Sequence, residues 1–181
     1  MSSPAAGPRA GGAHGRGVEA VVDRTIARIG QAASWLTLVI ALLMAGNVLL
    51  RYGFSIGSVW SQELEWHLLA PLVLVGMTYA LNKGDHVRVD VFYARYSPRG
   101  RAAVDLLSAV LAVALAGLVI RYSIPYVLQS YNIGEISPDP GGLTHRWVLK
   151  AMIPAGFALF GVQAAAQGVG AARRLFRQGQ P

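Results

Sequence analysis

The stretch IGQAASWLTLVIALLMAGNVLL, residues 29–50, decides the fold of this chain. It holds no charged side chain, and Arg28 and Arg51 flank it on its two sides. About 20 apolar residues in a helix cross the hydrocarbon core of a bilayer, so this stretch predicts a transmembrane helix. The run lacks the alternation of barrel strands, and unpaired backbone cannot face lipid, which leaves a helix as the element that fits.

Three further apolar runs predict spanning helices over about 63–82, 102–124 and 147–172. The composition agrees with lipid as the main solvent, because 54% of the residues are hydrophobic and only 14% are charged. Soluble domains carry about 25% charged residues. We therefore predict an all-α integral membrane protein, a four-helix bundle over residues 29–172. Ser97 and Pro98 are expected to start the third helix as its N-cap and first residue.

The distribution of positive charge predicts the orientation in the membrane. Twelve of the sixteen Lys and Arg residues lie in the N-terminal segment, the link between the second and third spans, and the C-terminal tail. Short cytoplasmic loops are enriched in Lys and Arg, so both termini are predicted to be cytoplasmic in a bacterial inner membrane. Residues 1–28 are expected to form a flexible tail and 173–181 a basic tail. The links at 52–62 and 125–146 then face outward.

Two pairs of polar side chains, each one helical turn apart, are candidate functional residues. Asn47 lies inside the first span and is followed by Arg51, a pair that could contact an ion or bond to another helix. Glu63 and His67 open the second span and could form a proton relay or a polar anchor at the interface. We favour the structural alternative for both pairs. Trp60, near the same end, fits the aromatic belt of a membrane interface.

Small residues recur at intervals of four in the last two spans. Ser108, Ala112 and Ala116 lie in the third span, and Ala164 and Gly168 begin the series in the fourth. Such stripes let helices pack closely in lipid, within the bundle or against a partner chain. We favour packing within the bundle.

Several classes of function find no support in the sequence. The chain has no cysteine, no phosphate-binding loop, no dinucleotide fingerprint and no zinc-protease motif, so neither an enzyme nor a cofactor or metal site is predicted. Its basic residues lie between apolar runs and form no stripe among polar residues, so no nucleic-acid partner is expected. Only His67 of the four His residues lies inside a span, which argues against haem held between helices.

Several motifs resemble the small, DctQ-like membrane subunit of tripartite ATP-independent periplasmic (TRAP) transporters. The matching stretches are residues 47–54, 60–64, 84–91, 134–138, 147–150 and 153–157. The link GDHVRVDV at 84–91, which contains His86, Arg88 and Asp90, is the most recognisable of them. One departure is Gln62, because the family often has an acidic residue before Glu63, and a paired-carboxylate role is therefore in doubt.

The resemblance implies a non-catalytic subunit that scaffolds a large, multi-spanning transport subunit. A periplasmic binding protein would deliver an organic acid, and a sodium gradient would drive uptake. The outward links, 54–62 and 131–146, would help dock the binding protein. Under this interpretation His86, Arg88 and Asp90 are structural residues that pair locally or with lipid headgroups. Glu135 and Lys150, from the outer motifs, are further candidates for structural or partner contacts.

Two alternatives from other functional classes remain open. One is a stand-alone four-helix channel or exporter, and the other is the membrane anchor of a redox enzyme. Transport by the purified chain alone would support the first, and a haem absorption band would support the second. Only the TRAP interpretation accounts for the link at 84–91.

Overall fold

The computed structural model describes residues 17–84 and 96–177. Within them it contains four long helices: α1 (Val18–Phe54), α2 (Val59–Lys83), α4 (Pro98–Asn132) and α5 (Trp147–Arg177). All four are long and apolar enough to cross a membrane, which confirms the predicted all-α class and its four spans.

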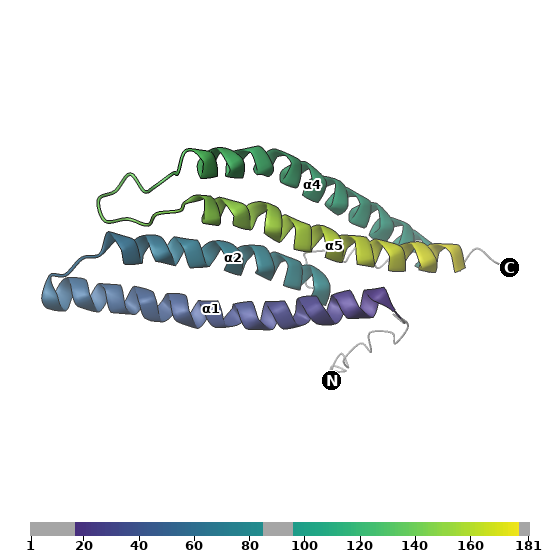
Figure 1. The fold of residues 1–181 in the computed structure, drawn as a ribbon. Coiled ribbons are helices and arrows are strands. Elements are labelled where there is room, and N and C mark those ends of the chain that lie inside the picture. The colour runs from purple at the N-terminus through teal and green to yellow at the C-terminus, as the bar shows by residue number, and fades with distance from the viewer. Residues whose placement is uncertain (1–16, 85–95, 178–181) are drawn as a thin grey trace, which may run out of the picture.

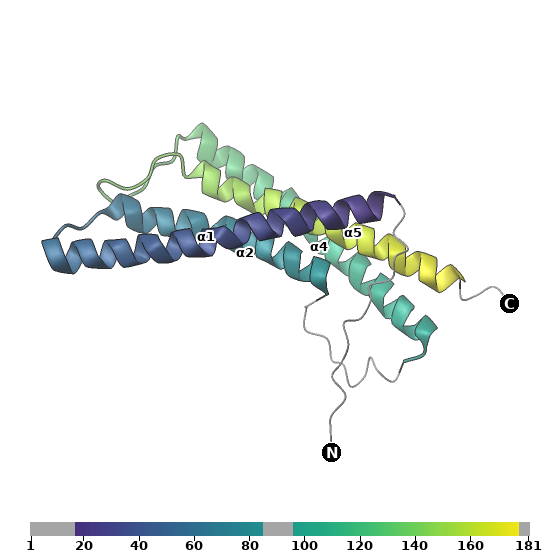
Figure 2. The ribbon, with the colours of Figure 1, turned by 90° about the horizontal axis from the view of Figure 1, so that it is seen from below.

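The helices run side by side in the order α4, α5, α2, α1 (Figure 1). The α4–α5 pair and the α1–α2 pair cross each other when the molecule is turned (Figure 2). The α1–α2 and α4–α5 connections lie together at one end of the molecule, which we call the loop end. The first residues of α1 and the last of α5 lie toward the opposite end, which we call the terminal end.

The helices extend beyond the apolar runs that predicted them. α1 begins at Val18 instead of Ile29, so residues 18–28 of the predicted flexible tail are helical. Arg24 and Arg28 do not interrupt this helix. The backbone hydrogen bonds of an α-helix form within the helix itself, so they do not depend on whether lipid or water surrounds it. The predicted start of α4 is confirmed: Ser97 is the N-cap, its hydroxyl accepts from the Gly100 N–H, and Pro98 is the first residue.

α4 and α5 pack through small residues, which in α4 have a different spacing from the predicted one. The buried residues of α4 recur every seventh position, at Ala102, Ala109, Ala116, Ser123 and Ser130. A repeat of seven keeps one face against a partner helix that crosses at a small angle. Ser108, predicted to lie in the stripe, is exposed. Ala116 of the predicted series in α4 is buried, and so are Ala164 and Gly168 of the predicted series in α5.

Two glycines of α5 mark the closest approach of this pair. A Cβ added to Gly161 would lie 3.2 Å from the Ala116 Cβ, and one added to Gly168 would lie 3.1 Å from the Ala109 Cβ. The contact between α1 and α2 is closer still, because a Cβ on Gly30 would lie 2.2 Å from the Tyr79 ring. The fold therefore depends on small side chains, which is typical of helix packing in lipid.

Candidate functional site

The loop between α4 and α5 is held in shape by its own backbone. The Ser137 N–H donates to the Leu143 carbonyl at 3.1 Å, and the Arg146 N–H donates to the Glu135 carbonyl at 3.2 Å. These two bonds join the outgoing and returning arms of the loop. The link predicted at 131–146 thus begins with the last two residues of α4 and continues as an ordered, hydrogen-bonded loop.

Glu63, in the second turn of α2, fastens this loop to the helices. The Ser137 hydroxyl donates to one carboxylate oxygen, and the Leu143 N–H donates to the other at 2.6 Å. Gly142 fits between them: an added Cβ would lie 2.5 Å from the Ser137 Cβ and 2.8 Å from Glu63 Oε2. One carboxylate therefore fixes the position of the loop relative to α2.

His67 does not share a proton with the Glu63 carboxylate. Its Nδ1 lies 2.8 Å from the backbone carbonyl of Glu63, one turn earlier in the same helix. The Nε2 atom is buried and has no hydrogen-bond partner within the described ranges. The two side chains begin on one helix face, as predicted, but the Glu63 carboxylate bonds to the loop and the His67 ring to the Glu63 backbone carbonyl.

Glu135 and Lys150 form an ion pair at the junction of the loop with α5. The Lys150 ammonium also lies 4.0 Å from the centroid of the Tyr126 ring on α4. This ammonium, by bonding to the carboxylate, holds the pKa of Glu135 below its ordinary value. Nearby, the Tyr131 and Trp147 rings meet edge to face at 5.4 Å, so α4, the loop and α5 are joined through several contacts.

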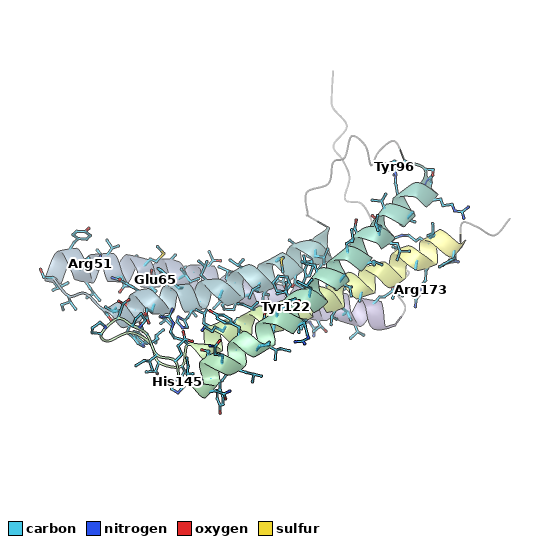
Figure 3. All side chains as sticks on the ribbon, turned by 90° about the horizontal axis from the view of Figure 1, so that it is seen from above. Arg51, Glu65, Tyr96, Tyr122, His145 and Arg173 are labelled. Carbon is cyan, nitrogen blue, oxygen red and sulfur yellow. The ribbon has the colours of Figure 1, made fainter. Side chains whose placement is uncertain are left out.

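Asn47 joins α1 to α2 near the loop end. Its Nδ2 donates to Glu65 Oε1 at 2.6 Å, and its Oδ1 accepts from the Ser61 hydroxyl. Arg51, one turn further along α1, is exposed, and so is Trp60 in the first turn of α2. Figure 3 labels Arg51, Glu65 and His145 at this end of the molecule. The structure thus places Asn47 in an interhelical bond.

A second polar cluster, toward the terminal end, was missed by sequence reasoning. Asp23 of α1 accepts through Oδ1 from Gln163 Nε2 of α5 at 2.9 Å and from Asn82 Nδ2 of α2 at 3.2 Å. Gln163 is 0% exposed. Gln167 Nε2 donates to the Leu81 carbonyl at 2.6 Å. Three helices meet at this cluster.

Ion pairs follow at the same end of the molecule. Arg173 pairs with Glu19 at 2.8 Å, and Arg174 pairs with Asp105 at 3.2 Å. Gln163 and Gln167 lie one turn apart in an apolar span, and this pattern could have indicated a contact between helices. The sequence offers no such indication for Asp23, because Asp23 lies before the uncharged run.

The three candidates His86, Arg88 and Asp90 lie outside the described residues. Of the others, Glu135 and Lys150 pair with each other at the loop end, and Glu63 bonds to the same loop at other residues. Asn47 bonds to α2. Glu65 and Ser137 complete these contacts and were not singled out from the sequence.

The arrangement is suited to holding helices and a loop in fixed positions. The buried polar side chains that the structure describes are all uncharged: Ser61, Thr78, Ser123, Ser130 and Gln163. No group of three or more His, Asp or Glu side chains within the described residues could hold a metal ion. Glu63, Glu65 and Glu135 toward the loop end, and Glu19, Asp23 and Asp105 toward the terminal end, make contacts that join one helix or loop to another.

The chain is similar to known transporter subunits along most of its length. A family model described as the DctQ component of tripartite ATP-independent periplasmic transporters matches residues 18–174. A putative TRAP transporter small permease protein of Haemophilus influenzae is 32% identical over 106 residues, 58% of this chain and 66% of that protein.

Two further relatives carry more specific names. The ectoine TRAP transporter small permease protein TeaB of Halomonas elongata is 24% identical over 148 residues, 81% of this chain and 76% of TeaB. The C4-dicarboxylate TRAP transporter small permease protein DctQ of Pseudomonas aeruginosa is 28% identical over 102 residues. The alignments span slightly less than two thirds of the Haemophilus protein and about half, 48%, of the Pseudomonas protein.

Proposed function

This chain belongs to the DctQ family of TRAP transporter components, and on that premise we propose that it scaffolds a large transport subunit without carrying the substrate itself. The family consists of transporter permease subunits, so the chain is a multi-pass membrane protein and not an enzyme.

The observation that carries the proposal is how little of each span is buried inside this chain. Between 6% and 17% of the most apolar window of each helix is buried. The other residues of these windows are half-buried or exposed, and many of the exposed ones are large and apolar, so lipid or another membrane subunit can cover them. A substrate pathway needs polar groups at the midplane between helices, whereas the charged side chains described here cluster toward the ends.

We place the loop end in the periplasm and the terminal end in the cytoplasm. This orientation rests on the predominance of Lys and Arg in the N-terminal segment, the link after α2 and the C-terminal tail. The inner membrane of a bacterium is then the location. Under this orientation Arg173 and Arg174 lie on the cytoplasmic side, where positive charge is favoured.

The periplasmic location makes the ordered loop a candidate surface for the binding protein. Glu63 and the Glu135–Lys150 pair fix the shape of the loop before any partner arrives, which lowers the ordering cost of binding. We propose that residues 54–62 and 131–146 contact the binding protein. We further propose that the assembled transporter is driven by sodium and takes up an organic acid. The C4-dicarboxylate name of one relative supports that substrate class.

The first experiment is affinity purification of the tagged chain from its native membrane in mild detergent. We expect a much larger polytopic subunit to co-purify in equal amount. A chain that purifies alone as a stable, monodisperse species would contradict the scaffold role. Reconstituting that species in vesicles would then test the channel or exporter alternative directly.

A further inference from the structure

A pocket of about 460 Å³ opens between α2 and α5 at the loop end, with Tyr126 of α4 on one side. Its walls are mainly aliphatic, from Leu69, Ala70 and Val73 of α2 and from Leu149 and Ile153 of α5. Trp66, Arg146 and Lys150 complete the lining. α2 and α5 run side by side, and α4 lies on the other side of α5 (Figure 1).

The pocket has a polar end and an apolar end. Arg146 immediately precedes α5, whereas Ile153 lies seven residues along the chain, a distance of about 10 Å in a helix. Trp66, 72% exposed, is an aromatic residue of the kind found at the border between headgroups and hydrocarbon. The pocket therefore runs from headgroup depth into the hydrocarbon region.

The two cations of the pocket differ in how they are neutralised. Lys150 is paired with Glu135 and lies over the Tyr126 ring. Arg146 is half-buried. Its guanidinium has no hydrogen bond or ion pair with any residue that the structure describes, and it interacts with Glu63 and Glu135 only through space. Arg146 thus retains its donors for a ligand.

A guanidinium with free donors above an apolar groove matches the chemistry of a phospholipid. Arginine binds a phosphate oxygen pair with two parallel hydrogen bonds, and basic pockets between membrane helices bind lipid headgroups.

We propose that this pocket binds part of one membrane phospholipid, with its phosphate on Arg146 and an acyl chain along Leu69 and Ile153, while the rest of the lipid lies in the bilayer. The lipid occupies the space between the two helix pairs and is a structural ligand of the chain. The proposal does not depend on the transport role, because it concerns this chain alone.

Native mass spectrometry of the full chain, purified from its membrane in mild detergent, tests the proposal. The wild-type chain is expected to retain one phospholipid. Arg146→Gln should lower the retained fraction by about tenfold, since hydrogen bonds to charged groups contribute on this scale. Arg121→Gln is the matched control, because it removes an exposed cation of α4 outside the pocket and should leave retention unchanged.

Ala70→Phe provides an independent variant that fills the apolar part of the pocket without changing any charge. This variant should also lose the bound lipid while circular dichroism shows that it keeps full helicity. If Arg146→Gln fails to fold, Ala70→Phe alone tests whether the pocket binds lipid. A wild-type chain without bound phospholipid, or folded variants that keep it, would overturn the proposal. A further result would also overturn it. If the complex with the large subunit contains no lipid and Ala70→Phe prevents this complex from forming, the occupant of the pocket is a protein segment.

Discussion

At the scale of single residues, Glu63 joins segments that are far apart in the chain. Its two partners, Ser137 and Leu143, lie 74 and 80 residues away. A carboxylate that accepts two hydrogen bonds is a strong fixed point, because charge-assisted bonds are about twice as strong as neutral ones. The shape of the loop therefore depends on one side chain of a different helix.

Replacing Glu63 with Gln should loosen this loop. The amide introduced by Glu63→Gln would keep one acceptor oxygen. Its NH2 group would face either the Ser137 hydroxyl or the Leu143 N–H, and one of the two hydrogen bonds would be lost. We expect the Leu143 amide to exchange its hydrogen about tenfold faster, on the scale of bonds to charged groups, as measured by hydrogen–deuterium exchange in detergent. Glu65→Gln is the control, because Glu65 bonds to Asn47 of α1. Equal protection of Leu143 in both variants would refute this account of the loop.

The Glu135–Lys150 pair predicts a dependence of stability on pH. Because the pKa of Glu135 is lowered in the folded state, the unfolded chain binds its proton at a higher pH than the folded chain does. The pair therefore stabilises the fold above the ordinary carboxyl pKa, and this stabilisation disappears as the pH falls through the lowered value.

The measurement is the Tm of the wild type and of Glu135→Gln between pH 7 and pH 3. The wild type should be more stable near neutral pH, and the two curves should converge in acid. Asp139→Asn removes an exposed carboxylate of the same loop and should follow the wild-type profile. A constant difference between the wild type and Glu135→Gln across the range would contradict the assignment.

At the scale of the helix, close packing decides which small residues cannot be enlarged. The buried face of α4 repeats every seven residues against the glycines of α5, and Gly30 of α1 lies against the Tyr79 ring of α2. Other glycines in the same helices have open space around them. The local sequence does not distinguish the two kinds, because both lie in uninterrupted apolar helix.

Gly30→Ala and Gly46→Ala form a matched pair within α1. The added methyl group at Gly30 would lie 2.2 Å from the Tyr79 ring, whereas nothing lies within 4 Å of one at Gly46. We expect Gly30→Ala to destabilise the chain by about 1–3 kcal/mol through overpacking. Gly46→Ala should be neutral or slightly stabilising, because Ala is the better helix former. Thermal unfolding in detergent, followed by circular dichroism, makes the comparison, and equal Tm values would show that the contact with Tyr79 carries no weight.

At the scale of the whole molecule, three helices meet near the terminal end through Asp23, Asn82 and Gln163. The loop end is joined instead by Asn47, Glu63 and the Glu135–Lys150 pair. α4 leans on α5 at one side of the array (Figure 1). Polar contacts at both ends thus hold a bundle whose apolar surface is mostly left for lipid and partners.

The proposed orientation makes a prediction for this scale. Alkaline phosphatase, which is active only after export, should be active when inserted at Asp139 and inactive when fused after Pro181. Green fluorescent protein should give the opposite result, with fluorescence at the C-terminus. The two reporters at each site control for expression of the fusions. Active phosphatase at the C-terminus would reverse the orientation inferred from positive charge.

The sequence by itself was enough to predict the class of fold, the four spans, the start of α4 and the family. Each of these depends on local features, such as a long uncharged run, an N-cap followed by proline, or a short motif at 84–91. The structure confirms four helices and the Ser97 cap, and the family match confirms the resemblance.

Only the tertiary structure decided which polar groups meet. Asn47 finds Glu65 across 18 residues, Glu63 finds Leu143 across 80, and Asp23 finds Gln163 across 140. Such pairings depend on how each helix is rotated and where the pairs cross, and these are set by close packing of small residues along the whole interface. The seven-residue stripe of α4 shows the same limit, because a single helix does not determine the angle at which its partner crosses it.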